Sequence, residues 1–552
     1  MEPRLKHNPS HLGDAALLRD FVVRQVDLDL IVERLHEPQG ASNQHLLIRG
    51  PHGAGKTTLV NRVIAELRRD PALAERWVPI AFDEESYTVT SAAELWLQTL
   101  VHLGEQTRDP GLMRVATELR GEADITRLRD RALARLGEFA AGQDKRLVVV
   151  VENVDMLFEQ QMSDEDGWDL RHTLQNEPWL MMLATSTTRL RSFHDPRRPL
   201  YELFWEHVLE PLHRQEIAAL WRMVSDTDLD PRRARAIEIL TGGSARLVVI
   251  LAASARGRSF RALMSELIAL VDESTPTFKH TIERLPPEER KIFITLADLW
   301  SPSTSRQVAE RARSDIRKTS ALLGRLERRG VIEEVGRIDN TRRYQVAERM
   351  LNLYHLLRRR DHARVGALVD FIIAYFEGDD ARSIQAPLPE LADAACEVGA
   401  AAFGWPQGHG PDGPAGADAQ LRAVSTAIVR GRWDAAWTAL GQLLGDPGVT
   451  RGRLSELLPW LLVAAARGQA TPLRETLEGS ASAVLLGPLV VALRGLDGLP
   501  VDAPQEVREV AEDIVERLAQ ARGAPAKERP QRALEGAGED AAAAPPRRRR
   551  RP

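Results

Sequence analysis

The feature that most constrains the fold of this 552-residue chain is a glycine-rich motif near its N-terminus. The motif matches the pattern G-x-x-x-x-G-K-[ST]. An apolar run at His45–Arg49 precedes it, and an amphipathic stretch at Lys56–Arg69 follows it. A strand before and a helix after are the context that this motif requires, which disfavours the alternative of a glycine-rich turn that only caps a helix. The motif consists of Gly50, Pro51, His52, Gly53, Ala54, Gly55, Lys56, Thr57 and Thr58.

This pattern predicts a phosphate-binding loop. Its glycines let backbone N–H groups curl around phosphates at a helix N-terminus, where the helix dipole favours anions. Lys56 would reach the β- and γ-phosphates as a mobile positive charge, and Thr57 would offer its hydroxyl to Mg²⁺. We therefore expect residues 50–58 to bind ATP, with Mg²⁺ as the metal.

The pattern around the motif alternates short β-branched runs with long amphipathic stretches, which predicts an α/β core with a parallel sheet. The run at Val148–Val151 is apolar on consecutive positions, as expected for a central strand buried on both faces. The expected strands are His45–Arg49, Trp77–Phe82, Arg146–Val151, Leu180–Thr185 and Trp205–Leu209. The expected core helices are Lys56–Arg69, Ala92–Leu103 and Ile125–Ala141, and those of a helical lid are Gln215–Ser225, Arg232–Leu240, Ala245–Ala255 and Ser259–Val271.

A pair of polar residues follows the buried strand at Arg146–Val151, where the chain continues as Glu152, Asn153, Val154 and Asp155. A carboxylate at the end of a buried strand near a phosphate loop is suited to hold the metal. The alternative is a polar residue that simply leaves the sheet. Beside a well-formed phosphate loop, the metal role of Glu152 is favoured.

Bulk composition limits the class of protein. The length suggests three or four domains. The formal net charge of -5 gives no global electrostatic reason for binding nucleic acid, so any basic surface must be local. The single cysteine, Cys396, excludes an intrachain disulfide and fits a reducing compartment. No apolar run reaches the roughly 20 residues of a membrane-spanning helix, and the first ten residues do not form a signal peptide, so we expect a cytoplasmic protein.

In this order, the motifs resemble initiator-type AAA+ ATPases and the related STAND and archaeal-type ATPases over roughly Asn8 to Arg360. The resemblance implies that Val22 and Val23, in an apolar segment before the phosphate loop, wrap the adenine. It implies that Thr187 is a polar sensor at the end of the fourth strand. It also implies that Arg246, at the start of a lid helix, reaches the γ-phosphate and makes the lid position depend on the nucleotide.

One departure from this family concerns hydrolysis. The family usually carries Asp-Glu or Asp-Asp where this chain has Glu152 and Asn153, and an asparagine cannot accept a proton. Either hydrolysis is slow, or another carboxylate substitutes, with Asp155, Glu84 and Glu85 as the candidates. We expect firm ATP binding and an ATPase with a low intrinsic or partner-stimulated rate.

The resemblance also implies an arginine finger that acts across a subunit boundary. Arg197 and Arg198 are the candidates, and a solvated turn beside Pro199 is the alternative. An arginine that acts in this way implies a homo-oligomer.

A second module begins near residue 285. Its expected order is three helices at Glu288–Trp300, Thr304–Arg313 and Asp315–Arg329, followed by two strands at Val331–Arg337 and Arg342–Val346. This is the order of a winged helix-turn-helix. The segment from Ser320 to Ile332 resembles the recognition helix and wing entry of MarR-like regulators.

The charge of this module suggests double-stranded DNA as a partner. From Ser305 to Arg343 there are ten Arg and one Lys against six acids, a local net charge of +5. The third helix would enter the major groove, and the wing would contact phosphates or the minor groove. The alternative is a winged helix that makes only protein contacts. The expected DNA-binding residues are Ser314, Arg317, Lys318, Ser320, Arg342 and Arg343.

These observations predict a P-loop α/β core at 1–210, a helical lid at 211–280, a winged helix at 281–361, an all-α region at 362–522 and a disordered tail at 523–552. The first functional hypothesis is a nucleotide-controlled switch that oligomerises, contacts DNA and docks a separate effector protein on its C-terminal helices, as in a bacterial defence or mobile-element system. The alternatives are an ATP-dependent, sequence-specific regulator or replication initiator, and a protein-interaction scaffold without DNA binding.

Overall fold

The computed structural model describes most of the chain. The described residues are 13–37, 44–82, 89–188, 190, 193, 195–255, 258, 262–263, 279, 282–338, 341–348, 351–352, 355–356, 362–376, 415–499, 501 and 503–521. They divide into two compact units. The first unit is drawn from Met1–Leu229, Gly243–Ala253 and Arg328–Gly330, and the second from Asp230–Gly242, Ser254–Glu327 and Val331–Pro552.

The first unit is built on a five-stranded sheet in the order β2-β3-β4-β1-β5, in which all paired strands are parallel. This confirms the predicted α/β fold class. Each predicted strand is present with ends within one residue of those expected. The strands are β1 (His45–Arg49), β2 (Trp77–Ala81), β3 (Arg146–Val151), β4 (Leu180–Ser186) and β5 (Phe204–Val208).

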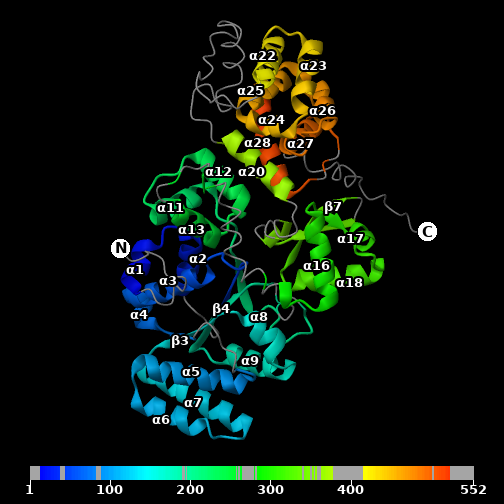
Figure 1. The fold of residues 1–552 in the computed structure, drawn as a ribbon. Helices are drawn as coiled ribbons and strands as arrows, with labels where there is room; N and C mark the ends of the chain where they lie inside the picture. The colour runs from blue at the N-terminus through cyan, green and yellow to red at the C-terminus, as the bar shows by residue number, and fades with distance from the viewer. Residues whose placement is uncertain are drawn as a thin grey trace, which may run out of the picture. The chain divides into compact units, whose positions relative to one another are not determined.

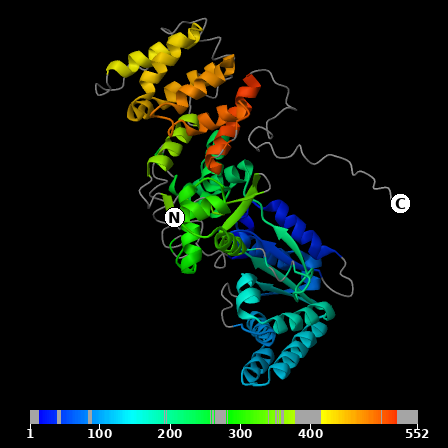
Figure 2. The same ribbon diagram turned by 90° about the vertical axis from the view of Figure 1, so that its right-hand side faces the viewer.

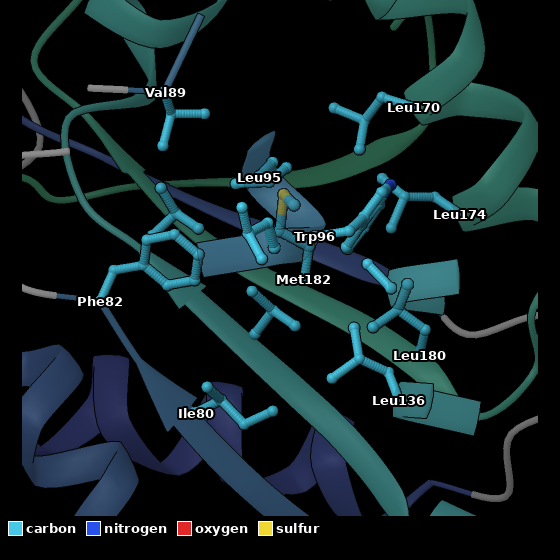
Figure 3. Close-up of a cluster of buried hydrophobic side chains, with 14 of the residues drawn as sticks. Ile80, Phe82, Val89, Leu95, Trp96, Leu136, Leu170, Leu174, Leu180 and Met182 are labelled. Atoms are coloured by element: carbon cyan, nitrogen blue, oxygen red, sulfur yellow. The ribbon is translucent and has the colours of Figure 1, made fainter. Parts of the chain in front are cut away.

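Helices cover both faces of this sheet, and β3 shows why its sequence is apolar throughout. Leu147, Val149 and Val151 pack into a core on one face, together with α5 and α7. Val148 and Val150 pack on the opposite face against α3. Figure 3 shows the first of these cores, in which Trp96 lies among Leu174, Leu180 and Met182. A strand buried on both faces has no polar face, which is the reason for its unbroken apolar run.

The helices of the first unit include several that the sequence analysis did not anticipate. Helices α5, α6 and α7 pack against one another in Figure 1. The unpredicted helices include α4, α6 and α9. The helices are α1 (Asp14–Asp20), α2 (Gln25–His36), α3 (Lys56–Arg69), α4 (Pro71–Arg76), α5 (Ala92–Thr107), α6 (Pro110–Leu119), α7 (Ile125–Gln143), α8 (Val154–Met156), α9 (Asp164–Asn176), α11 (Arg214–Ser225) and α13 (Ala245–Ser254).

The second unit contains a small antiparallel sheet of order β6-β8-β7 beside three helices. The chain order is helix, short strand, helix, helix, strand, strand. These elements are α16 (Pro287–Leu299), β6 (Ser303–Thr304), α17 (Ser305–Ala312), α18 (Ile316–Arg328), β7 (Ile332–Ile338) and β8 (Thr341–Val346). Helix α12 (Pro231–Thr241), predicted as part of the lid, also belongs to this unit. The lid helix predicted at Ser259–Val271 falls almost entirely outside the described residues.

The described residues from 362 onward are mostly helical, and Figure 2 draws these helices in yellow-green to red. The helices are α20 (His362–Phe376), α22 (Ala415–Val429), α23 (Trp433–Leu444), α24 (Pro447–Gly452), α25 (Leu454–Ala464), α26 (Ala470–Glu478), α27 (Gly487–Leu496) and α28 (Gln505–Ala521). The tail predicted at 523–552 lies outside the described residues. Where the structure describes the chain, none of its helices has the length and apolar character needed to cross a bilayer.

Candidate functional site

The glycine-rich loop joins β1 to α3. Gly53 and Gly55 have φ values of +80° and +96°, a region that favours glycine because a side chain would strain the backbone there. The backbone N–H of Gly50 donates to the carbonyl of Ser186 at 3.1 Å, which ties the start of the loop to the end of β4. The loop therefore leaves the sheet at a fixed point and turns tightly into the N-terminus of α3.

The ammonium group of Lys56 lies inside the curl of this loop. It donates to the carbonyl oxygens of Gly50 at 2.8 Å and Pro51 at 3.1 Å, and the residue is only 7% exposed. Burial lowers the pKa of Lys56 to about 8, against the opposing effect of the carboxylates of Asp155 and Glu152. A buried cation at the N-terminus of a helix is a strong attractor for a phosphate group.

A hydroxyl and a carboxylate meet next to this lysine. Thr57 Oγ1 donates to Glu152 Oε2 at 2.5 Å. The two residues follow β1 and β3, which are separated by β4 in the sheet. Both side chains supply oxygen, which is the donor atom that Mg²⁺ prefers, and Mg²⁺ typically takes one or two protein ligands beside substrate phosphates. The residues present therefore fit the metal that the motif implies.

The residues that follow Glu152 have separate positions. Asn153 adopts a left-handed backbone with φ +54°, and its N–H donates to Thr185 Oγ1 at 3.1 Å. Asp155, in the first turn of α8, accepts a hydrogen bond from Thr187 Oγ1 at 2.7 Å. The structure thus brings together Asp155 and Thr187, which the sequence analysis assigned to separate roles. The alternative carboxylates Glu84 and Glu85 lie outside the described residues.

The first turn of α13 packs directly on the phosphate loop. The backbone N–H of Arg246 donates to the carbonyl of Gly53 at 3.0 Å. The approach is so close that a Cβ added to Gly53 would lie 2.9 Å from Arg246 Cβ. The side chain of Arg246 is exposed. The backbone contact thus holds the Cα of Arg246 at the loop, while its side chain is exposed to solvent.

Arg24 ends the segment at 21–24 that resembles the adenine-wrapping segment of the family, and it contacts the phosphate loop. It is 5% exposed, with φ +66°, and its guanidinium donates to the carbonyls of Glu210 at 2.5 Å and Ala54 at 3.2 Å. It therefore joins the phosphate loop to the chain after β5. The preceding Val22 is 39% exposed and Val23 is half-buried. The signal in the sequence was a lone arginine directly after the apolar run at 21–23.

Both candidate finger arginines have partners within the chain. Arg198 pairs with Asp164 at 2.5 Å, and Arg197, whose side chain is 87% exposed, pairs with Asp195 at 2.9 Å. To act on a neighbouring subunit, either guanidinium group would have to exchange this carboxylate for a phosphate.

The predicted DNA-binding residues lie on α18, just before it, and on β8. Arg317 and Ser320 are exposed, and Ser314 is half-buried. Lys318 is exposed but pairs with Glu288 at 2.5 Å.

In the hairpin, Arg342 pairs with Glu334 at 3.3 Å. Arg343 is half-buried and donates to the carbonyl of Pro302 at 2.7 Å. The basic residues of this module are therefore not equally available to a partner.

A parallel sheet with a glycine-rich loop after β1, a buried lysine at the start of α3 and an acidic residue at the end of β3 defines a P-loop nucleoside triphosphatase domain. Residues 20–185 match the family model described as the AAA ATPase domain. The expected resemblance to AAA ATPases is thereby confirmed for this part of the chain. A search of curated protein sequences finds no match.

A search of solved structures finds matches of low sequence identity, including the following three. The Walker-type ATPase of Pyrococcus abyssi has 15% identity and a TM-score of 0.43, covering 62% of this chain and 97% of its own. The ORC1 protein of Aeropyrum pernix in complex with DNA has 16% identity and a TM-score of 0.36, covering 64% and 98%. Drosophila ORC bound to DNA has 14% identity and a TM-score of 0.31, covering 64% and 94%. At such low identity and score, these structures do not indicate what this chain binds.

Proposed function

We propose that this chain is an ATP-binding switch that holds ATP and Mg²⁺ at residues 50–58 and hydrolyses ATP slowly. One observation carries the proposal: the ammonium of Lys56, the hydroxyl of Thr57 and the carboxylate of Glu152 converge at the N-terminus of α3. A cation beside a hydroxyl–carboxylate pair is the arrangement that a nucleoside triphosphate with its metal requires.

Each group has a separate task in binding. The backbone N–H groups of the loop and the dipole of α3 hold the β-phosphate, and Lys56 neutralises charge between the β- and γ-phosphates. Thr57 and Glu152 would hold Mg²⁺, which would shield the phosphate charge. Asn153 can donate or accept a hydrogen bond but cannot take a proton, which accounts for slow turnover.

The contact between Arg246 and Gly53 supports a nucleotide-dependent change. Because the backbone of Arg246 is bonded to the phosphate loop, its exposed side chain can swing toward a γ-phosphate without moving its point of attachment. Loss of the γ-phosphate removes that attraction, so α13 would be held differently with ATP and with ADP. Oligomerisation through the nucleotide face, with Arg197 or Arg198 reaching a neighbouring site, belongs to the same proposal.

For the output, we propose contact with double-stranded DNA through the module at 287–346. Its element order supports a winged helix, and its exposed basic residues include Arg317 at the start of α18. Sequence-specific binding would make the chain a regulator or initiator, and an absence of DNA binding would make it a protein scaffold. A role in bacterial defence, with a separate effector docked on the C-terminal helices, completes the proposal.

The first experiment measures ATP affinity by titration with a fluorescent ATP analogue in Mg²⁺. Lys56→Ala is expected to weaken binding by at least about 100-fold, because it removes the only charge in the loop that contacts the phosphates. Lys291→Ala, which removes an exposed lysine on α16, is the matched control and should bind as the wild type does. Equal affinity of Lys56→Ala and wild type would refute the proposed site.

The second experiment measures DNA binding as a function of salt. The double variant Arg317→Glu with Lys318→Glu should abolish binding to duplex DNA while ATP affinity stays unchanged. Protection of a defined sequence would favour the regulator or initiator, whereas sequence-independent binding that requires ATP would favour the switch. If the wild-type protein binds no duplex DNA at low salt, the protein-interaction scaffold is the hypothesis that remains.

A further inference from the structure

Two acidic residues lie near the phosphate loop, Glu152 and Asp155. Glu152 has a partner at the loop, whereas one carboxylate oxygen of Asp155 has no hydrogen-bond partner among the described residues. Glu152 accepts the hydroxyl of Thr57 at 2.5 Å and so belongs to the metal-binding corner. Asn153 has no carboxylate, and its backbone N–H donates a hydrogen bond to Thr185 Oγ1. Among the described residues, Asp155 is the other carboxylate whose charge acts on Lys56.

Asp155 is held by one oxygen only. Its Oδ2 accepts the hydroxyl of Thr187 at 2.7 Å. Its Oδ1 is buried and has no hydrogen-bond partner among the described residues. A buried carboxylate oxygen without a partner costs on the order of 1–3 kcal/mol, so a fold that keeps one usually does so for a function.

The position of Asp155 suits a role in phosphate chemistry. Its negative charge acts on the ammonium of Lys56, where it raises the pKa against the stronger opposing effect of burial. Lys56 in turn lies at the loop that would hold the γ-phosphate. A carboxylate whose charge acts on that ammonium is suited to act on a water at the γ-phosphate.

We infer that Asp155 Oδ1 orients the attacking water and accepts its proton, in place of the acid that Asn153 lacks, and that Thr187 is the positioning residue for this carboxylate. The inference rests on the proposed ATP site. The water oxygen forms a bond to the γ-phosphorus while the bond from that phosphorus to the bridging oxygen breaks. ADP leaves with the electron pair, and the proton of the water passes to Asp155 and from there to solvent.

The test separates binding from chemistry. Asp155→Asn keeps an oxygen that can accept from Thr187 but removes the proton acceptor. We expect its affinity for ATP to stay within about 3-fold of wild type, while single-turnover hydrolysis falls by about 100-fold or more. Binding of ADP with aluminium fluoride, which mimics the transferring phosphate, should weaken. Glu159→Gln, an exposed carboxylate on the same segment, is the matched control and should change none of these values.

Thr187 provides an independent arm that remains usable if Asp155→Asn does not fold. Thr187→Val removes the hydroxyl and should slow hydrolysis by roughly 10-fold with ATP affinity retained, and Thr187→Ser should restore the rate. Wild-type hydrolysis in Asp155→Asn, or equal rates for Thr187→Val and Thr187→Ser, would overturn the inference. A wild-type protein that binds no ATP would instead refute the proposed function, so the two failures are distinct.

Discussion

Acidification should destabilise the first unit through one buried histidine. His45 begins β1 and is 1% exposed. In the neutral form that carries its proton on Nε2, it donates to the carbonyl of Leu174 at 3.1 Å, and its Nδ1 accepts the N–H of Met182 at 3.1 Å. A second proton would face the N–H of Met182 and would be buried without water. Burial accordingly lowers the pKa of His45 from 6.5 to about 4.

The sign and size of the effect follow from this pKa. Below pH 6.5 His45 of the unfolded chain binds a proton, whereas His45 of the folded chain binds it only near pH 4. Stability is therefore unaffected above pH 6.5 and falls as the pH drops from 6.5 to 4. At about 1.4 kcal/mol per pH unit, the loss over this window is about 3 kcal/mol.

The assay compares the wild type with His45→Gln, which can still donate and accept but does not titrate. Hydrogen exchange of the Met182 amide reports on the first unit alone, because that amide is bonded to His45. At pH 7 the Met182 amide should be less protected in the variant than in the wild type. The free energy of opening of the wild type minus that of the variant should fall by about 3 kcal/mol between pH 7 and pH 4. A difference that stays constant with pH would mean that the folded protein accommodates a charged ring, which would refute the reasoning.

Three further predictions concern the site and the second unit. Gly53→Ala should weaken ATP binding by roughly 10-fold, because an alanine with a left-handed backbone costs about 1–2 kcal/mol and its Cβ would press on Arg246. An unchanged affinity for ATP in a titration would contradict this prediction. Asn153→Glu should raise the rate of phosphate release in a coupled assay, and an unchanged rate would show that this position does not limit hydrolysis. Arg235→Ala removes the cation that pairs with Glu509 and Asp513, two half-buried carboxylates of α28, and should destabilise the second unit by about 3 kcal/mol in urea. The exposed pair of Arg222 with Asp228 should contribute little, and equal losses for the two arginines would contradict this difference in exposure.

The strands and the phosphate loop could be predicted because their signals are local. The apolar run of β3 and the spacing of glycines before Lys56 specify conformations over six to nine neighbouring residues. Helix α6 was missed although its sequence holds a start signal. Asp109 caps it by accepting from the N–H groups of Gly111 and Leu112, and Pro110 occupies its first position. An Asp-Pro-Gly run is equally typical of a turn, and only the packing of α6 against α5 decides between the two.

The shared assignment of Thr57 and Glu152 to Mg²⁺ predicts that the two residues lie together, but the individual hydrogen bonds of the candidate site could not be predicted, because they join residues far apart in the chain. The bond between Thr57 and Glu152 spans 95 positions, and the bond between Asp155 and Thr187 spans 32. Each depends on the sheet order, which places β4 between β1 and β3, and strand order is not written in any local pattern. The same holds for Arg24, whose partners include the carbonyl of Glu210.

The charge of the α17–β8 segment shows how far a count of residues can mislead. A net charge of +5 treats every arginine alike, but an arginine can meet a phosphate only if its present partner gives way. Arg343 donates to a backbone carbonyl and is half-buried, so removing it would disturb the fold before it tested any contact with DNA. Lys318 would have to leave Glu288, an exchange that costs little in solvent, whereas Arg317 is already exposed. Among these three residues, Arg317 is therefore the one whose replacement tests the proposed contact with DNA most directly.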